Sequence, residues 1–290
     1  MAERVGVLGA GSIVGKILLP MLGQSGRRVV AFSRKAHADS GDGVEWHRLN
    51  QSPGAAQELR GVVSRWICLA PIMVLPDYFP LLEAHGVQRV VAFSTTSRFT
   101  KERSSDLAER ALANRLARSE EQLAQWAEKN GVEWVVLRPT LIYGYGLDRN
   151  VNEIARFIRR FGFFPVLGSA QGLRQPVHVN DVAAACLAAL QRPEAANRAY
   201  DISGGETLAY REMITRVFEV LKRRPRLLEI PLWMFRLALQ LLKIVPRFRN
   251  WSPAMAERMN QDMVFDHAEA ARDLSFAPKP FLPTKEDVGK

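Results

Sequence analysis

Short runs of apolar, β-branched residues alternate with longer amphipathic stretches along most of the chain. Such runs are typical of parallel strands that are buried on both faces of a sheet. The expected strands are Arg4–Leu8, Arg28–Ser33, Val44–Leu49, Ser64–Leu69, Arg89–Ser94, Val132–Leu137 and Ala199–Ser203. The pattern therefore predicts an α/β fold, a Rossmann-type doubly wound parallel sheet with helices on both faces.

Helical periodicity fills the intervals between these strands. The longest expected helix has Asp106 and Glu109 at capping-box spacing, Leu116 and Leu123 in its apolar stripe, and Gly131 just beyond its end. A loop, Arg138–Asn150, follows the sixth strand. The expected helices are Ser12–Gly23, Pro76–His85, Asp106–Lys129, Val151–Phe161 and His178–Leu190.

From Thr207 onward the alternation stops, and helices at Tyr210–Lys222 and Leu232–Ile244 indicate a smaller unit. We expect a dinucleotide-binding Rossmann domain over residues 1–150. The chain would return to this domain at residues 174–205. Residues 151–173 and 206–277 would form a small C-terminal substrate lobe. Three prolines in the last dozen residues predict a loose tail over 278–290.

Three glycines lie between the first strand and the first helix, in the segment VGVLGAGSIVG. Gly9 would permit a tight turn, Gly11 would let the backbone approach a pyrophosphate, and Gly15 would let the helix pack on the sheet. The helix N-terminus, with Ser12 and Ile13, would then face the phosphate charge. The alternative is a plain glycine turn in an α/β fold.

The end of the second strand indicates which cofactor is preferred. Ser33, Arg34 and Lys35 follow this strand, and no carboxylate occurs before Asp39. A carboxylate would bind the ribose hydroxyls, whereas a guanidinium can hold a 2′-phosphate with two hydrogen bonds. The sequence therefore predicts NADP, with NAD as the alternative, unless Arg34 and Lys35 are only exposed loop charges.

The chain carries a net charge of +10, which favours anionic partners such as phosphorylated ligands. Basic clusters at Arg156–Arg160, Lys222–Arg226 and Arg247–Arg249 lack a nucleic-acid recognition motif, so we expect a solvated surface and no nucleic-acid partner. The five histidines show no metal-ligand spacing, which predicts that there is no metal site.

Cys68 and Cys186 lie in apolar runs, which predicts buried free thiols in a reducing compartment. We see no signal peptide and no apolar run long enough to span a membrane, so the expected location is cytoplasmic. The apolar segment Pro231–Trp251 ends in basic residues. Packing over a substrate cleft is the favoured interpretation of this segment, and peripheral membrane contact is the alternative.

Five segments together resemble the extended short-chain dehydrogenase/reductase superfamily, including its atypical members, and most closely its NAD-dependent epimerase/dehydratase family. They occur in the family's order and cover most of the first 215 residues. The resemblance implies hydride transfer between a nicotinamide cofactor and a nucleotide sugar or a related hydroxyl or ketone. The segments are VGVLGAGSIVG, VVAFSTTS, VVLRPTLIYGYG, RQPVHVNDVAAA and YDISGGETLAYREM.

The resemblance also implies roles for matching residues. Ala70 and Pro71 would flank the adenosine-side ribose and phosphates, and Pro139 would pass near the nicotinamide. His178 and Asp181, in a segment that borders the substrate lobe, would fix that segment by hydrogen bonds rather than act in chemistry.

The family's catalytic residues are matched only in part. Thr96 takes the place of the catalytic Ser/Thr, and Ser12 stands where the family has its middle glycine. The family's Tyr and Lys, four residues apart on the helix after the fifth strand, fall near Leu112–Ala113 and Leu116–Ala117. Neither pair can transfer a proton.

Two hypotheses follow. In the first, the chain is an epimerase/dehydratase-like oxidoreductase in which Lys101, Tyr143 or Tyr145 does the acid–base work, although these tyrosines also suit packing and Lys101 suits a surface charge. In the second, the chain binds NAD(P) without catalysis, as a sensor, scaffold or assembly protein. Substrate identity and oligomeric state stay open.

Overall fold

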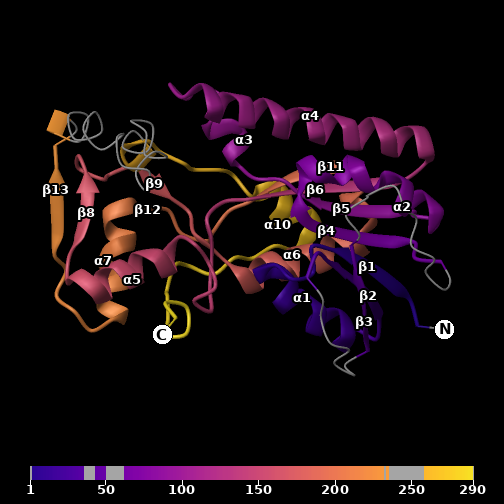
Figure 1. The fold of residues 1–290 in the computed structure, drawn as a ribbon, viewed down its shortest axis with the longest axis horizontal. Coiled ribbons are helices and arrows are strands. Elements are labelled where there is room, and N and C mark those ends of the chain that lie inside the picture. Colours follow the sequence, from indigo (N-terminus) through magenta and orange to yellow (C-terminus); the bar gives the residue numbers. More distant parts are fainter. Residues whose placement is uncertain (1, 36–42, 50–61, 232, 235–257, 290) are drawn as a thin grey trace.

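The strands expected from the apolar runs form one seven-stranded parallel sheet (Figure 1). The computed structural model describes residues 2–35, 43–49, 62–231, 233–234 and 258–289. The strand order across the sheet is β11-β6-β5-β4-β1-β2-β3, so the order reverses between β1 and β4, where ligands bind in doubly wound sheets. The strands are β1 (Arg4–Leu8), β2 (Arg28–Ser33), β3 (Val44–Arg48), β4 (Arg65–Pro71), β5 (Arg89–Phe93), β6 (Glu133–Pro139) and β11 (Arg198–Ile202).

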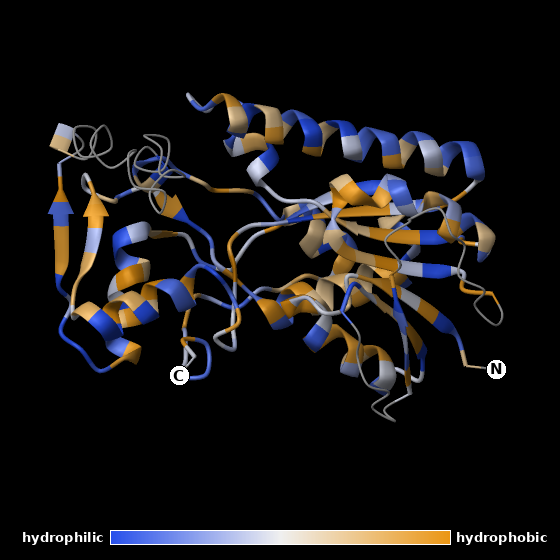
Figure 2. Ribbon diagram, in the orientation of Figure 1, coloured by the Kyte–Doolittle hydropathy of each residue, from blue (hydrophilic) through white to orange (hydrophobic). Residues whose placement is uncertain are grey.

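Helices cover both faces of this sheet, as the doubly wound fold requires. One face packs against α1 (Ile13–Gln24), α6 (Val179–Gln191) and α10 (Ala268–Leu274). The other packs against the 3₁₀ helix η1 (Ile72–Tyr78), α2 (Phe79–Ala84) and α4 (Leu107–Asn130). The central strands β1, β2, β4, β5 and β6 therefore have apolar side chains on both sides, and Figure 2 shows orange, hydrophobic strand segments between these layers. The fold class predicted from the sequence is confirmed.

The caps predicted for α4 are present with one difference. Asp106 is the N-cap, and its side chain accepts a hydrogen bond from the Ala108 amide at 2.8 Å. Gly131 ends the helix in the left-handed conformation with φ 64°. Glu109 does not complete a capping box, because its carboxylate accepts a hydrogen bond from the Ser104 hydroxyl at 2.7 Å.

The segment expected as one helix at Pro76–His85 is divided between two helices and begins earlier, at Ile72. The chain first forms η1, and α2 starts only at Phe79. Pro76 lies inside η1 and Pro80 lies in the first turn of α2, and neither proline has an N–H to donate to a regular α-helical ladder.

The lobe is built on two helices and a two-stranded parallel ladder. Helices α5 (Val151–Phe161) and α7 (Tyr210–Val220) share a core, and β8 (Phe164–Leu167) pairs with β13 (Leu227–Ile230). Strands this short carry too little periodicity to be recognised in the sequence, so β8 and β13 were not predicted. Two further ladders were also missed: β7 (Ile142–Tyr143) with β10 (Val177–His178), and β9 (Leu173–Arg174) with β12 (Leu208–Ala209).

Helix α10 differs from the expected division of the chain. It was assigned to the lobe, but Ala270 and Leu274 are buried in the core of the sheet domain. The Tyr200 hydroxyl of β11 donates to the Asp273 carboxylate at 2.9 Å and fixes this docking. The predicted helix Leu232–Ile244 and most of the segment Pro231–Trp251 lie outside the described residues.

The C-terminal segment is not a loose tail, contrary to expectation. Phe281 and Val288 are fully buried in the core of the lobe. Arg159 of α5 donates hydrogen bonds to the backbone carbonyls of Val288 and Gly289. The prolines that suggested disorder instead stiffen an extended strap, which lowers the entropy cost of packing it.

Asp287 joins this strap to the rest of the molecule. Its carboxylate accepts hydrogen bonds from the Tyr145 amide and from the Thr284 amide and hydroxyl, and it lies 3.1 Å from Nε2 of His178. Burial alone would raise the pKa of Asp287, but these hydrogen bonds lower its pKa below the ordinary value.

Both cysteines are buried free thiols, as predicted, and burial raises the pKa of Cys68 to about 12. Among the described residues, no helix is both long enough and apolar enough to cross a membrane.

Two neighbouring residues of the strap give a matched test of its packing. Phe281→Ala should lower the free energy of unfolding by about 3 to 5 kcal/mol, because it removes a fully buried ring. Leu282→Ala removes a side chain that is 68% exposed and should change stability by no more than about 0.5 kcal/mol. Urea unfolding measures both values, and equal small effects would contradict a packed strap.

Candidate functional site

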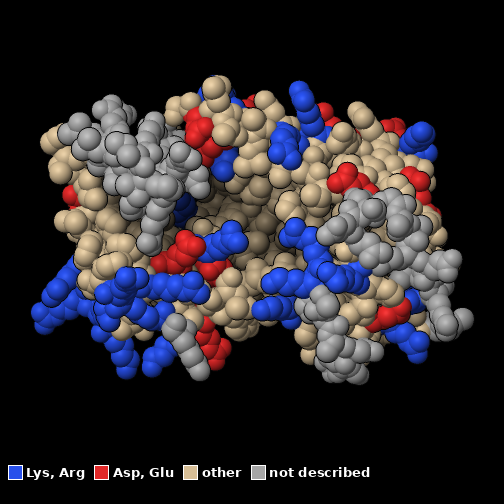
Figure 3. All heavy atoms as spheres, in the orientation of Figure 1, with Lys and Arg blue, Asp and Glu red and all other residues tan. Residues whose placement is uncertain are grey.

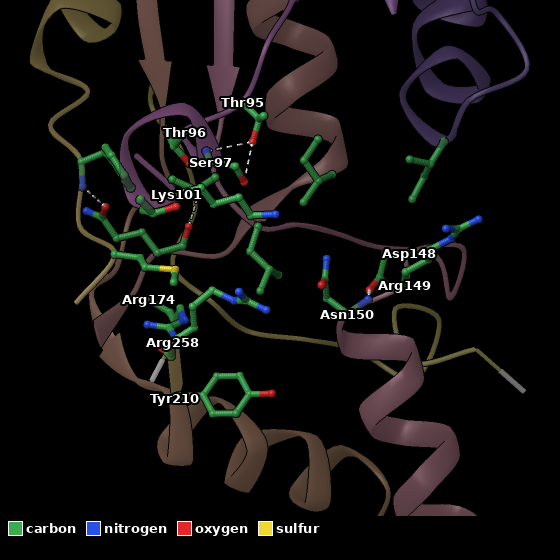
Figure 4. A pocket seen from close by; sticks show the side chains of 18 of the residues that line it. Thr95, Thr96, Ser97, Lys101, Asp148, Arg149, Asn150, Arg174, Tyr210 and Arg258 are labelled. Atoms are coloured by element: carbon green, nitrogen blue, oxygen red, sulfur yellow. Dashed lines mark hydrogen bonds between the residues drawn. The ribbon is translucent and has the colours of Figure 1, made fainter. Parts of the chain in front are cut away.

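A cleft of about 920 Å³ opens at the C-terminal edge of the sheet, between the sheet domain and the lobe. Figure 3 shows this face hollowed between the two parts, with basic side chains at its border. The turn after β1 and the loop after β5 form one side, and the lobe forms the other (Figure 4). The residues that line it include Ser12, Ile13, Thr95, Thr96, Ser97, Lys101, Thr140, Asp148, Arg149, Asn150, Arg174, Tyr210 and Arg258.

The turn after β1 has the shape that the three glycines predicted. Gly9 has φ +75°, and a Cβ atom there would lie 2.6 Å from the Ala70 amide nitrogen at the end of β4. A Cβ atom on Gly15 would lie 2.1 Å from the Ala10 carbonyl oxygen. Both positions therefore exclude any side chain, and the turn packs directly on its neighbours.

This turn leaves backbone amides directed away from the protein's own acceptors. The Gly9 and Ala10 amides donate to the Phe32 carbonyl at 3.1 and 3.2 Å. Within the described part of the chain, by contrast, the amides of Gly11 and Ile13 have no acceptor. Free amides at a helix N-terminus are a ready site for an anion such as a pyrophosphate.

Ser12, which stands where the family has its middle glycine, has a structural role of its own. Its hydroxyl accepts a hydrogen bond from the Gly15 amide at 3.1 Å and caps α1. The side chain lies at the cleft, where a glycine would leave more room for a ligand.

The residues after β2 are exposed and basic. The Ser33 hydroxyl accepts a hydrogen bond from the Lys35 amide at 3.1 Å, which shapes the turn that presents Arg34. Burial raises the pKa of Tyr78 in η1, and the nearby Arg34 charge opposes this. Arg34 thus follows the strand whose Phe32 carbonyl accepts hydrogen bonds from the Gly9 and Ala10 amides of the glycine turn.

Thr96 lies in the cleft, at the end of β5 and before α3 (Ser97–Thr100). Its amide and its hydroxyl both donate to the Pro139 carbonyl, at 3.3 and 3.4 Å. Pro139 does not line the cleft, so it acts here as a support for Thr96. The neighbouring Thr95 hydroxyl is half-buried and lies 3.2 Å from the Ser97 hydroxyl.

A buried carboxylate supports this loop from below. Glu120 of α4 is only 6% exposed and accepts hydrogen bonds from the Ser94 hydroxyl at 2.5 Å and from Arg138 Nη2 at 2.6 Å. Arg98 of α3 also donates to Glu120. The Arg98 and Arg138 guanidinium carbons lie 5.3 and 5.2 Å from the Phe99 ring centre. This network joins β5, α3, α4 and β6.

Sequence reasoning did not identify Glu120, although a signal was present. Glu120 lies four residues after Leu116 and three before Leu123, so it falls within the apolar stripe of α4. A carboxylate in a buried stripe requires partners, and these partners come from strands that are distant in the sequence.

Lys101 faces the cleft but is not a free amine. Its Nζ lies 3.8 Å from Glu109, and Glu109 also forms an ion pair with Arg258. Glu109 therefore joins α4 to the segment that contains Arg258, across one end of the cleft.

Arg174 is committed to backbone carbonyls. Its Nη1 donates to the carbonyls of Leu173 and Gln261 at 2.7 and 2.8 Å, and its Nη2 donates to the Arg258 carbonyl. The guanidinium carbon lies 5.4 Å from the centre of the Tyr210 ring. Arg174 holds the far wall in place, and Tyr210 is the tyrosine that this wall presents to the cleft.

Asp148 was not predicted from the sequence either. Its Oδ1 accepts hydrogen bonds from the amides of Asn150 and Asn152, at the start of α5. Its Oδ2 is buried and has no partner among the described residues. The side chain lines the cleft, so a ligand hydroxyl could supply the missing donor.

The structure contradicts the acid–base role expected for Tyr143. The side chain is 2% exposed, lies outside the cleft and packs edge-on against His178 and Phe281. Burial raises the pKa of Tyr143, which disfavours the phenolate. Tyr145 also lies outside the cleft, and its hydroxyl accepts a hydrogen bond from Asn180.

His178 and Asp181 hold their segment in place, as expected. His178 Nδ1 accepts a hydrogen bond from the Asn180 amide and caps α6, and Asp181 accepts one from the Lys279 amide at 3.0 Å. No group of His, Cys, Asp or Glu side chains in the described part of the chain is arranged to hold a metal ion.

Comparison with known proteins supports the resemblance seen in the sequence. The sequence profile of the NAD dependent epimerase/dehydratase family matches residues 79–203, which confirms the resemblance to this family. The UDP-glucose 4-epimerase of Vibrio cholerae is 27% identical over 119 residues, or 41% of this chain and 36% of that protein.

A second curated relative has a different role. It is subunit 9 of the alpha subcomplex of mitochondrial NADH dehydrogenase from Arabidopsis thaliana, 30% identical over 100 residues. That match covers 34% of this chain and 25% of the subunit. The curated relatives matched here are thus aligned over well under two thirds of their own length.

Among solved structures, the fold is shared by the Thermus thermophilus UDP-glucose 4-epimerase in complex with NAD. The TM-score is 0.69 at 18% identity, and the match covers 99% of this chain and 96% of that one. At this level of identity the similarity establishes the fold.

The two adjacent glutamates of α4 test the buried network. Glu120→Gln should lower the free energy of unfolding by at least about 2 kcal/mol, because Arg98 and Arg138 lose their shared charge partner. Glu121→Gln changes an exposed side chain and should have little effect. Thermal unfolding monitored by circular dichroism compares them, and a stable Glu120→Gln protein would refute the network.

Proposed function

We propose, on the premise of the family resemblance, that this chain binds a nicotinamide dinucleotide along the C-terminal edge of its sheet and uses it on a nucleotide sugar or a related hydroxyl or ketone. When bound, the nicotinamide would supply the hydride acceptor or donor. The protein's own residues would position both ligands and exclude water.

The observation that carries the proposal is the glycine turn at the head of the cleft. Side chains at Gly9 and Gly15 would collide with backbone, and the amides of Gly11 and Ile13 have no acceptor among the described residues. These features fit a pyrophosphate, with Ala70 and Pro71 on its adenosine side.

We propose NADP as the preferred cofactor, with NAD as the alternative. Arg34 follows β2 at the place where a carboxylate would bind ribose hydroxyls, and its guanidinium is suited to a 2′-phosphate. Ser33 shapes the turn that presents Arg34, through the hydrogen bond from the Lys35 amide. The buried free thiols suit a reducing compartment, and we propose the cytoplasm.

The charge of the cleft supports a phosphorylated substrate. Four cationic side chains line it, namely Lys101, Arg149, Arg174 and Arg258. Glu109 pairs with Lys101 and Arg258, whereas Arg149 and Arg174 form no ion pair with a described carboxylate. A volume of about 920 Å³ suits a ligand of the size of a nucleotide sugar beside a nicotinamide. UDP-glucose 4-epimerases appear both among the curated relatives and among the structures with this fold.

For the reaction itself, the Thr96 hydroxyl would turn its one hydrogen from the Pro139 carbonyl to the reacting oxygen. The Thr96 amide would stay bonded to Pro139, and Glu120 would hold the loop. Lys101, which lines the cleft, would move away from Glu109 to exchange a proton with the substrate hydroxyl. Burial raises the pKa of Tyr210, so this phenol is better suited to donate a hydrogen bond than to accept a proton.

One observation favours a second candidate, a cofactor-binding scaffold or assembly protein without catalysis. The positions that match the family's Tyr–Lys pair fall near Ala113 and Ala117, and Tyr143 is buried outside the cleft. The Arabidopsis relative is itself named as a subunit of a larger complex.

Turnover assays separate the two candidates. The purified protein is supplied with NADP or NAD and a panel of UDP- and GDP-sugars, and products are followed by absorbance at the nicotinamide band and by NMR. Epimerised or oxidised sugar supports the enzyme. Tight dinucleotide binding with no product from any sugar would contradict it and favour the scaffold.

The cofactor preference has its own test. Arg34→Ala should raise the Kd for NADPH by about ten- to a hundredfold, since it removes charge-assisted hydrogen bonds to the 2′-phosphate. The Kd for NADH should stay unchanged. Arg28→Ala, an exposed arginine at the opposite end of β2, is the matched control, and fluorescence titration measures each value. Equal losses for both nucleotides would refute the assignment of Arg34.

Thr96→Val tests the proposed role of the hydroxyl. It should lower kcat by about a hundredfold while leaving the NADPH Kd within about twofold, because the hydrogen bond forms at the reacting oxygen. Thr215→Val, whose hydroxyl donates to the Arg211 carbonyl on α7, should keep normal kcat. Unchanged turnover in Thr96→Val would remove Thr96 from the reaction.

A further inference from the structure

The end of the lobe farthest from the sheet carries a concentrated positive charge. Residues 154–167 and 220–228 contain seven Arg and Lys residues and no Asp or Glu. Figure 3 shows basic side chains gathered at this end, at the lower left of the view. We call this surface the basic face; its cations are Arg156, Arg159, Arg160, Lys222, Arg223, Arg224 and Arg226.

The two segments form one continuous surface. The Arg223 guanidinium donates to the Ile158 carbonyl at 2.8 Å, and the Phe164 amide donates to the Arg226 carbonyl at 2.9 Å. The pairing of β8 with β13 places Leu227 beside Phe164. The end of α5 and the turn after α7 therefore lie side by side.

This charge is not neutralised within the described part of the protein. None of the seven cations forms an ion pair with a described carboxylate. Arg159 and Arg223 donate to backbone carbonyls, which leaves their charge in place. The C-termini of α5 and α7 contribute about −0.5 charge each, far less than seven cations require.

Aromatic side chains lie among these cations. Phe157 contacts three other rings, with centroid distances of 4.6 Å to Phe161, 5.7 Å to Phe163 and 5.4 Å to Phe164. Phe161 is 51% exposed, and the Arg160 guanidinium carbon lies 5.2 Å from its ring centre. Phe161 therefore places an exposed aromatic ring among the cations, on a base of partly buried rings.

We propose that the basic face docks this protein on an anionic lipid bilayer. Arginine and lysine would lie at the phosphate level, and the exposed ring of Phe161 would enter the boundary of the acyl chains. Leu228 of β13, the residue after Leu227, is also exposed. Phenylalanine and leucine suit hydrocarbon better than hydrogen-bonded base recognition, so a bilayer fits this face better than a nucleic acid does.

Co-sedimentation with vesicles tests the proposal. The full chain should bind vesicles of phosphatidylcholine with about one third phosphatidylserine, release in high salt, and ignore pure phosphatidylcholine vesicles. The variant Arg156→Gln, Arg224→Gln, Arg226→Gln should lose about a hundredfold in affinity. These three side chains form no hydrogen bond or ion pair with a described residue, so the change breaks no structural contact of that kind, and a normal melting temperature checks folding.

The matched control removes the same charge elsewhere. Arg115→Gln, Arg118→Gln, Lys129→Gln changes three exposed cations of α4, which also lie outside any ion pair of the described residues. This variant should bind anionic vesicles as the parent does. Equal loss in both triple variants would overturn the proposal, since net charge alone would then explain the binding.

Phe161→Ser tests the aromatic component. It should lower vesicle affinity by about tenfold at low salt, because the contact of the ring with the acyl-chain boundary is lost. No binding of the parent protein to anionic vesicles would overturn the proposal. A gel shift with duplex DNA at physiological salt that depends on the basic face, without vesicle binding, would overturn it in favour of a nucleic-acid partner.

Discussion

The contact between the turn after β1 and the end of β4 controls the architecture of the site. Gly9 adopts φ +75° so that its backbone can lie against the Ala70 amide, and Gly15 lies against the Ala10 carbonyl. Because no side chain fits at either position, α1 begins close to the sheet with the Gly11 and Ile13 amides free of described acceptors. The crevice where the strand order reverses thereby gains an anion-binding rim.

Two further sets of contacts hold the remaining walls of the cleft. Glu120 fixes the loop after β5 through Ser94, Arg98 and Arg138. On the lobe, Asp287 and Phe281 hold the C-terminal strap against β7, β10 and the core of the lobe. Both sets bury charge or apolar area away from the cleft. They give the cleft residues fixed positions without occupying the space a ligand needs.

Sequence patterns were sufficient for the sheet, because long apolar strands and capped helices are local features. The strand β1, the cap Asp106 and the glycine turn all lie where the pattern indicated them. The cleft walls were harder to predict, because the partners of Glu120 lie 18 to 26 residues away and Asp287 meets His178 across 109 residues. Tyr143 was misjudged for the same reason: its burial depends on Phe281, which the prolines had suggested was loose.

The central claim is that the glycine turn holds a pyridine dinucleotide, and denaturing the protein as purified tests it most directly. Mass spectrometry of the released small molecules, with isothermal titration of the stripped and refolded protein, identifies what the turn binds. The account predicts NADP(H) or NAD(H) in the released fraction, or heat on adding one of them. No nucleotide in the released fraction and no heat with either would contradict it.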